Sequence, residues 1–290
     1  MDTEKCRLLL QAVEAGSFSA AAEVGHYTPS GVMRAVNALE NELGCHVIAR
    51  SAQGIVVTKD GERLLPILRR FLQCEEEMFQ VSAQIRGLVT GNITVGTYFS
   101  LAANWLPPVL KAFRCQYPGI TVRLEECANH DMYAGLAERR FDCCLTTRRP
   151  FHGDWIPLMR DEMLAWLPPD HPLANAASFP VKRFAEESFI QPLPGQDTDV
   201  ERILTSEGIT CQPAYSSVDN YTTYRLVEAG LGVSMNNRLM TASWNGRVVT
   251  VPLDPPHFIE LGIVLPSVKN APPAVQRFIR FLQENRETGI

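Results

Sequence analysis

The stretch "TPSGVMRAVNALENELG", residues 28–44, predicts one helix with its start and stop signals attached. Thr28 suits the N-cap, Pro29 suits the first helical position, and Gly44 suits the residue that ends the helix. Aliphatic side chains recur at helical spacing along one face: Val32, Val36, Leu39 and Leu43. The other face carries a hydroxyl, a thioether, a guanidinium and an amide, on Ser30, Met33, Arg34 and Asn37. Such a helix can pack on its neighbours and still present polar groups to a partner.

The flanking segments place this helix in a recognisable unit. "TEKCRLLLQAVEAG" (3–16) and "SFSAAAEVG" (17–25) predict two shorter helices, the second with Ser17 as N-cap. Two helices, a tight turn and a third helix are the order of a helix-turn-helix. "CHVIARSAQGIVVTKDG" (45–61) then predicts a two-strand hairpin with its tip near Gln53. We therefore expect residues 1–58 to form an all-α winged helix-turn-helix domain.

The polar face of the third helix matches the chemistry of a DNA major groove. Arg can bind guanine and Asn can bind adenine through two hydrogen bonds each, and an apolar group can cover a thymine methyl. The predicted base-reading residues are Ser30, Met33, Arg34 and Asn37. Predicted phosphate contacts that fix the register are Ser17, Ser19, Thr28, Pro29, Arg50 and Thr58. The chain has a net charge of −5, so this hypothesis rests on where its cations lie and not on their number.

A long helical pattern follows in "KDGERLLPILRRFLQCEEEMFQVSAQIRG" (59–87), and we assign residues 59–88 to a linker helix. Its apolar stripe is wide and long enough to pair with a second copy of the chain. The predicted dimerisation residues are Leu64, Leu68, Phe71, Met78 and Ile85. Packing of the helix on its own domain is the alternative. Two copies would read two half-sites, which adds phosphate contacts; the sequence does not distinguish a homodimer from a homotetramer.

A glycine-containing break lies at "GLVTGN" (87–92), and after it the sequence pattern predicts alternating strands and helices. The segments "ITVGTY", "LAANWLPPVLKAFRCQYPG", "ITVRLEEC", "HDMYAGLAERR" and "FDCCLTT" read as βαβαβ. This order predicts a parallel sheet with helices on its faces. Residues 92–290 are long enough for two α/β lobes, lobe I at about 92–162 and 267–290 and lobe II at about 163–266.

The chain resembles LysR-type transcriptional regulators over essentially its whole length. The most specific stretch is "AVEAGSFSAAAEVGHYTPSGVMRAVNALENELGCHVIARS" (12–51), followed by "VVTKDGERLLP", "ITVGTYFSLAANWLPPVLKAFRCQYPGITVRL", "WLPPDHPLA" and "LVEAGLGVSM". The resemblance implies an α/β multi-domain protein with a winged helix-turn-helix, a dimerising linker helix and a two-lobed domain like a periplasmic binding protein. It also implies operator DNA, a small-molecule effector and RNA polymerase as partners. Gly31 and Met33 replace a frequent Ala and Ser of the family, so the operator sequence does not transfer.

In open α/β sheets, ligands bind at the carboxyl ends of strands and at helix N-termini. Four segments meet that description, and matching positions line the effector cleft in the related regulators. They contribute the predicted effector-binding residues Thr97, Ser100, Thr146, Thr147, Gln196, Thr198, Asn220 and Thr222. Hydroxyls and amides beside helix N-termini favour a small carboxylate or a similar anion. Capping a helix is the alternative role for Ser100 and Thr198.

Other classes of function receive less support. No catalytic motif is present, so we predict neither an enzyme nor catalytic residues, and no cofactor. The eight cysteines include no CxxC pair, and Cys127 with His130 lacks a second pair of metal ligands, so no metal site is expected. The neighbours Cys143 and Cys144 raise the alternative of a redox-sensing regulator. A stand-alone solute-binding protein would explain residues 92–290 but not the first 90. Without a secretory signal or a membrane span, the cytoplasm is expected, with no membrane partner.

Overall fold

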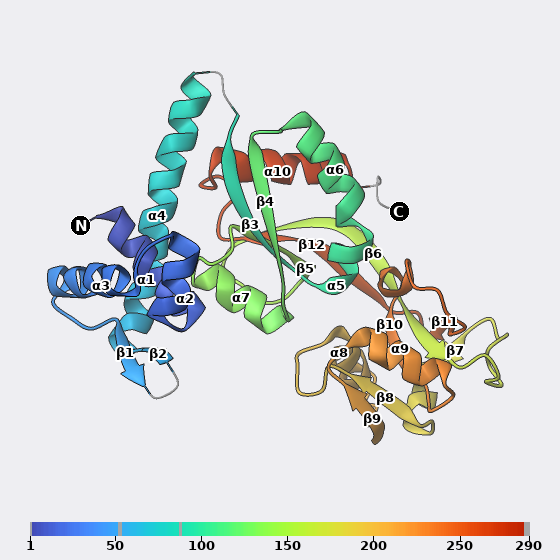
Figure 1. Ribbon diagram of the computed structural model, residues 1–290. Helices are drawn as coiled ribbons and strands as arrows, with labels where there is room; N and C mark the ends of the chain where they lie inside the picture. The colour runs from blue at the N-terminus through green and yellow to red at the C-terminus, as the bar shows by residue number, and fades with distance from the viewer. Residues whose placement is uncertain (1, 52–53, 87–88, 287–290) are drawn as a thin grey trace.

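The computed structural model describes residues 2–51, 54–86 and 89–286 (Figure 1). Three helices open the chain: α1 (Thr3–Ala15), α2 (Phe18–Gly25) and α3 (Pro29–Leu43). The side chains of Ser17 and Thr28 accept hydrogen bonds from first-turn N–H groups, as N-caps do. Gly16 and Gly44 adopt the left-handed conformation that ends a helix. The predicted caps of the three helices are therefore present.

The wing is an antiparallel pair, β1 (Ile48–Ser51) and β2 (Gly54–Val57), in which Ile48 lies opposite Val57. The predicted tip residue Gln53 lies outside the described residues. Buried Glu40 ties the wing to α3, because its Oε1 accepts hydrogen bonds from the N–H groups of Val47 at 2.6 Å and Ile48 at 3.0 Å. Burial raises the pKa of this carboxyl, but hydrogen bonds from Ile48, His46 and Val47 outweigh it and bring the pKa below its ordinary value.

Helix α4 (Lys59–Ile85) connects the two halves of the molecule. Leu65 and Leu68 in its first half are buried in the core of the helix-turn-helix. Its second half extends past that domain and runs beside the α/β region (Figure 1), where Gln80 accepts a hydrogen bond from the N–H of Ala274 at 3.2 Å. Within the predicted boundary at 87–92, residues 87 and 88 lie outside the described residues.

Lobe I contains the predicted parallel strands β3 (Gly91–Thr97), β4 (Ile120–Glu126) and β5 (Cys143–Thr147), with β3 in the centre. Its helices are α5 (Phe99–Asn104), α6 (Leu106–Gln116), α7 (Asn129–Ala137) and α10 (Pro273–Glu284). The helix predicted from 101 to 119 is in fact split at Trp105. Pro107 and Pro108 cause the split, since proline has no N–H to continue an earlier helix but is accommodated in a first turn.

Lobe II contains β7 (Phe179–Pro180), β8 (Phe189–Pro192), β9 (Pro213–Ser217), β10 (Ser234–Asn237) and β11 (Val249–Asp254). Its helices are α8 (Asp199–Ser206) and α9 (Asn220–Glu228), with 3-10 turns η1 (Val181–Ala185) and η2 (Arg238–Thr241). The long strand β6 (Asp154–Leu167) runs from one lobe into the other, pairing with β12 (Phe258–Leu265) in lobe I and with β10 and β11 in lobe II.

The lobe boundary at 266 is wrong. Strand β12 pairs with β5, placing Leu261 opposite Thr147, so residues 258–265 belong to the sheet of lobe I. An apolar strand that crosses between lobes has the same sequence pattern as one inside either lobe, and the misassignment follows from that.

The helix-turn-helix and the α/β region have separate apolar cores. Val32, Val36 and Leu39 are fully buried in the first core, which confirms the apolar face predicted for α3. The larger core joins the two lobes and includes edge-to-face packing of Phe113 on Phe278, with ring centroids 5.1 Å apart. Among the described residues, no helix combines the length and apolarity needed to span a membrane.

Candidate functional site

The polar face of α3 is open to solvent. Ser30, Arg34 and Asn37 are exposed, while Met33 is half-buried. Neither Arg34 nor Asn37 has a side-chain hydrogen bond or ion pair to any residue that the structure describes. A guanidinium and an amide one turn apart, both free, can form the paired hydrogen bonds by which base edges are read.

Side chains around α3 extend this surface. The guanidinium of Arg50 on β1 contacts the sulfur of Met33 and lies over the ring of Phe18, 5.2 Å from its centroid. Thr28 Oγ1 accepts a hydrogen bond from the N–H of Gly31 at 3.1 Å. Ser19 and Pro29 are exposed beside the start of a helix. The wing and the N-terminal ends of α2 and α3 therefore face the same side as the polar stripe.

Two predicted phosphate contacts have structural roles. Thr58 Oγ1 caps α4 by accepting from the N–H of Gly61 at 2.9 Å, and its proton is donated to the carbonyl oxygen of His46 at 2.6 Å. No proton of this hydroxyl remains for a phosphate, so the assignment of Thr58 is corrected. Ser17 accepts from the N–H of Ala20 at 3.1 Å but keeps its own proton, and it stays a predicted contact.

The exposed apolar face of α4 differs from the predicted one. Leu68 is 3% exposed and Leu64 packs against the same helix-turn-helix core, so both contribute to folding of one chain and leave the predicted dimerisation set. Met78 is 61% exposed and Ile85 is 81% exposed. A heptad-like series with spacings of four and three residues follows from Ile67 to Ile85, and its member Phe71 is half-buried because it also packs against the helix-turn-helix core: Ile67, Phe71, Cys74, Met78, Val81 and Ile85. We call this series the α4 seam.

A cavity of about 440 Å³ lies between the two lobes. Of the predicted effector-binding residues, Gln196, Thr198 and Asn220 line it. Thr198 also caps α8, accepting from the N–H of Glu201 at 3.1 Å. The remaining lining includes amides and aromatic rings that were not predicted: Phe99, Asn129, Tyr221, Asn236, Asn237 and Trp244.

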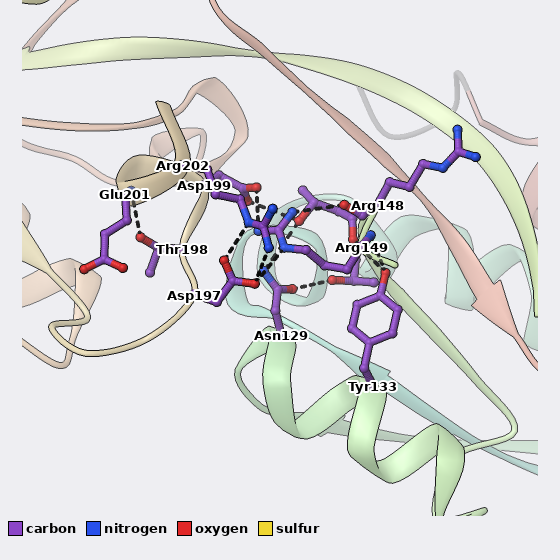
Figure 2. A network of polar contacts seen from close by, with 11 residues as sticks. Asn129, Tyr133, Arg148, Arg149, Asp197, Thr198, Asp199, Glu201 and Arg202 are labelled. Atoms are coloured by element: carbon purple, nitrogen blue, oxygen red, sulfur yellow. Dashed lines mark hydrogen bonds and ion pairs between the residues drawn. The ribbon is translucent and has the colours of Figure 1, made fainter. Parts of the chain in front are cut away.

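Beside the cavity, a polar network joins the lobes (Figure 2). The guanidinium of Arg149, 8% exposed, donates to Asp199 at 2.8 Å and to Asp197 at 3.1 Å. Thr147 Oγ1 donates to the second oxygen of Asp199 at 3.2 Å. We call these four residues the interlobe latch. Asp197 also pairs with Arg202, whose hydrogen bond is the main reason that the pKa of Asp197 lies below its ordinary value.

The other predicted effector positions do not line the cavity, and they are corrected. Thr146 and Thr147 are buried in the polar network, where Thr146 donates to Asn129. Thr97 and Ser100 are fully buried. Thr222 is exposed outside the lining, and its N–H donates to Asp219, the N-cap of α9. Thr97, Thr146 and Thr147 lie on central strands of the sheet that are buried on both faces at this end, so their hydroxyls are covered whichever way they point.

The lining residues that were not predicted differ in how readily they could be recognised in the sequence. Phe99 adjoins the predicted Ser100, which is buried elsewhere, and Tyr221 adjoins the predicted Asn220, which also lines the cavity, so both segments were located correctly. Trp244 comes from the turn after η2, which no pattern in the sequence marked.

The charge of the lining disfavours the expected carboxylate. Among the described residues that line the cavity there are five carboxyl groups and no Lys or Arg: Glu126, Asp131, Asp197, Asp199 and Asp219. The exposed Arg148 points away from the network (Figure 2) and lies outside this lining. An anionic effector would therefore lack a cationic partner here.

The two adjacent cysteines are not placed for redox chemistry. Cys143 and Cys144 are fully buried, and burial raises the pKa of each thiol well above its ordinary value. A protonated, inaccessible thiol is a poor nucleophile. Within the described ranges, no group of three or more His, Cys, Asp or Glu side chains is arranged to hold a metal ion.

A winged helix-turn-helix joined by a long helix to a two-lobed domain with a cleft defines the class of ligand-responsive transcriptional regulators. The model of the LysR substrate binding domain matches residues 86–287, and that of the bacterial regulatory helix-turn-helix protein, lysR family, matches residues 3–62. The chain belongs to the LysR family of transcriptional regulators.

Individual relatives agree with this assignment. The HTH-type transcriptional regulator YvbU of Bacillus subtilis is 28% identical over 290 residues, covering 98% of each chain. Among solved structures, full-length OxyR of Pseudomonas aeruginosa has a TM-score of 0.76 at 21% identity, covering 100% of this chain and 99% of that one. CbnR complexed with its target DNA has a TM-score of 0.68 at 19% identity, covering 98% and 99%. The structural likenesses show a shared fold.

Proposed function

We propose that the protein binds specific DNA as a homodimer, with α3 of each copy in a major groove. The observation that carries this proposal is the free polar stripe of α3, opposite a fully buried apolar face. A relative of the same fold, CbnR, has been solved with its target DNA, which supports the same use of this domain. On this proposal the protein works in the cytoplasm, beside the chromosome and RNA polymerase, and has a regulatory role without catalysis.

The α4 seam supports the dimer. One helix-turn-helix makes few phosphate contacts, and two copies on a two-fold axis double them. The seam offers exposed Ile, Met and Val side chains at the spacing of a two-stranded coiled coil. A dimer of dimers would use further surfaces in addition to this one.

We further propose that a small molecule in the interlobe cavity controls operator binding or the transcription that follows. The cavity volume lies in the range of small-molecule sites. A ligand in the cavity would shift the equilibrium between more open and more closed lobes. The interlobe latch would respond to that shift, because the contacts of Arg149 with Asp197 and Asp199 join the two lobes.

The substitution Arg34→Ala tests the DNA-binding proposal. Binding to a duplex selected from a random pool should weaken by about 1–3 kcal/mol, while binding to non-specific duplex changes little. Arg114→Ala is the matched control, because Arg114 is exposed on α6 in the other domain. Equal affinity of wild type and Arg34→Ala for the selected duplex would contradict the role of α3.

A further inference from the structure

The carboxyl groups that line the cavity differ in how far nearby cations and helix termini balance their negative charge. Asp197 and Asp199 are paired with the guanidinium groups of Arg149 and Arg202. Asp219 caps α9, and its oxygen accepts from the N–H of Thr222 at 2.6 Å, so the helix terminus balances part of its charge. These three carboxylates therefore stabilise lobe II, and because their charge is largely balanced they contribute little to the electrostatic potential in the cavity.

Two carboxyl groups of lobe I have no such partner. Glu126, at the end of β4, and Asp131, in the first turn of α7, make no ion pair with any described residue. Arg140 is near, but it donates to the main-chain oxygen of Asp131 and not to its carboxylate. Both carboxyl groups are exposed, and the N-terminal turn of α7 balances part of the charge of Asp131, so the negative charge that remains on the lobe I side of the cavity is carried mainly by Glu126.

Aromatic rings form a different part of the lining. The ring centroid of Trp244 lies 5.6 Å from that of Phe99 and 5.3 Å from that of Tyr221. The side chain of Tyr221 is 47% exposed, although a ring in a packed cluster is ordinarily covered. Faces of aromatic rings attract cations and also accept hydrocarbon groups.

Amide side chains complete the lining. Asn129, Gln196, Asn220 and Asn236 line the cavity. The carbonyl oxygens of Asn129, Asn220 and Asn236 already accept hydrogen bonds from Thr146, Asn236 and Asn237, and each keeps a second lone pair. The amides can therefore pair with a ligand of either polarity, and it is the carboxylates and the rings that favour one with positive charge and an apolar body.

We propose that the effector is an organic cation, a small molecule with a protonated amine attached to a hydrocarbon body. The ammonium group lies toward Glu126 and Asp131, and the hydrocarbon body contacts the wall of Phe99, Tyr221 and Trp244. An anion of the same size would meet unpaired carboxylates and no cation, which disfavours it. This proposal rests on the proposed function, in which the interlobe cavity holds the effector.

The test compares ligands that differ only in their polar group. Linear and phenyl-substituted amines of about two to eight carbons, sized for such a cavity, are matched with the carboxylate and the alcohol of the same chain. Binding to the full-length protein is followed by calorimetry and by the fluorescence of its tryptophans. We expect at least one amine to bind about tenfold more tightly than its matched carboxylate and alcohol. A carboxylate or alcohol that binds as tightly as its amine, or a complete absence of amine binding, would overturn the proposal.

Variants locate the charge that is responsible. Glu126→Gln combined with Asp131→Asn should weaken amine binding about tenfold and leave alcohol binding unchanged. Glu125→Gln is the matched control, because Glu125 pairs with Arg123 and lies outside the lining. Affinity for the selected duplex is measured without ligand in parallel. Wild-type protein that binds its selected duplex but no amine, or a double variant that binds the amine as tightly as wild type, contradicts the cationic effector, whereas absence of specific DNA binding contradicts the proposed function itself.

Discussion

Replacing Glu40 by Ala tests how the recognition helix is held to the wing. The carboxylate of Glu40 accepts the N–H groups of Val47 at 2.6 Å and Ile48 at 3.0 Å, and both donors lie in a buried stretch. A hydrogen bond to a charged group contributes about 1.5–3 kcal/mol, and a buried donor left unpaired costs about 1–3 kcal/mol. Once the carboxylate is removed, water can enter beside the exposed His46 and pair with part of the freed N–H groups. We therefore expect the local free energy of unfolding to fall by about 3 kcal/mol.

Hydrogen exchange of the full-length protein is the direct assay. In the wild type, the amides of residues 47 and 48 should exchange slowly, and in Glu40→Ala they should exchange about a hundredfold faster, as that loss of free energy implies. Amides in β3 of the other domain serve as an internal control. Unchanged protection at residues 47 and 48 would contradict the role of Glu40 in holding the wing.

The same carboxyl predicts a dependence on pH. Since the pKa of Glu40 is lowered in the folded state, its stabilisation is present above the unfolded value of about 4.3 and is lost as pH falls through the folded value. The wild-type wing should therefore lose protection in acid, and Glu40→Ala should lose less over the same interval.

Three further predictions concern packing, assembly and thiols. Gly61→Ala should destabilise the winged domain by about 1–3 kcal/mol, measured by denaturant unfolding, because an added Cβ would lie 2.1 Å from the carbonyl oxygen of Val47; an unchanged midpoint would contradict this. Met78→Asp should shift the purified protein from dimer to monomer in analytical ultracentrifugation, because it would bury a charge in the α4 seam. A dimer that persists would show that the interface lies on another surface. Cys143 and Cys144 should resist thiol reagents until the protein unfolds, whereas Cys115, exposed on α6 outside the α4 seam, reacts at once; early modification of the buried pair would support redox sensing.

The N-terminal domain could be predicted closely because its signals are local. A cap such as Thr28 and a stop such as Gly44 act within one turn of the helix they bound, so each can be recognised from a few neighbouring residues. The role of Glu40 could not be recognised in that way, because its partners at 47 and 48 meet it only after the wing has folded back.

The cavity was harder to predict because it depends on contacts distant in sequence. The end of β5 at Thr147 and the start of α9 at Asn220 were located correctly, yet the charges of the lining come from residues on both lobes. Nothing near Arg149 in the sequence indicates its partners, and only the folded chain pairs it with Asp197 and Asp199. The expected carboxylate effector was derived from helix N-termini without knowledge of these neighbours.

Two copies of α3, joined through α4, should occupy grooves of one duplex. Hydroxyl-radical footprinting of the full-length protein on a duplex selected from a random pool measures this directly. We predict an inverted repeat protected in two patches whose centres lie about one helical turn, or a whole number of turns, apart. A pool that yields no enriched sequence, or a single patch occupied by one chain, would contradict it.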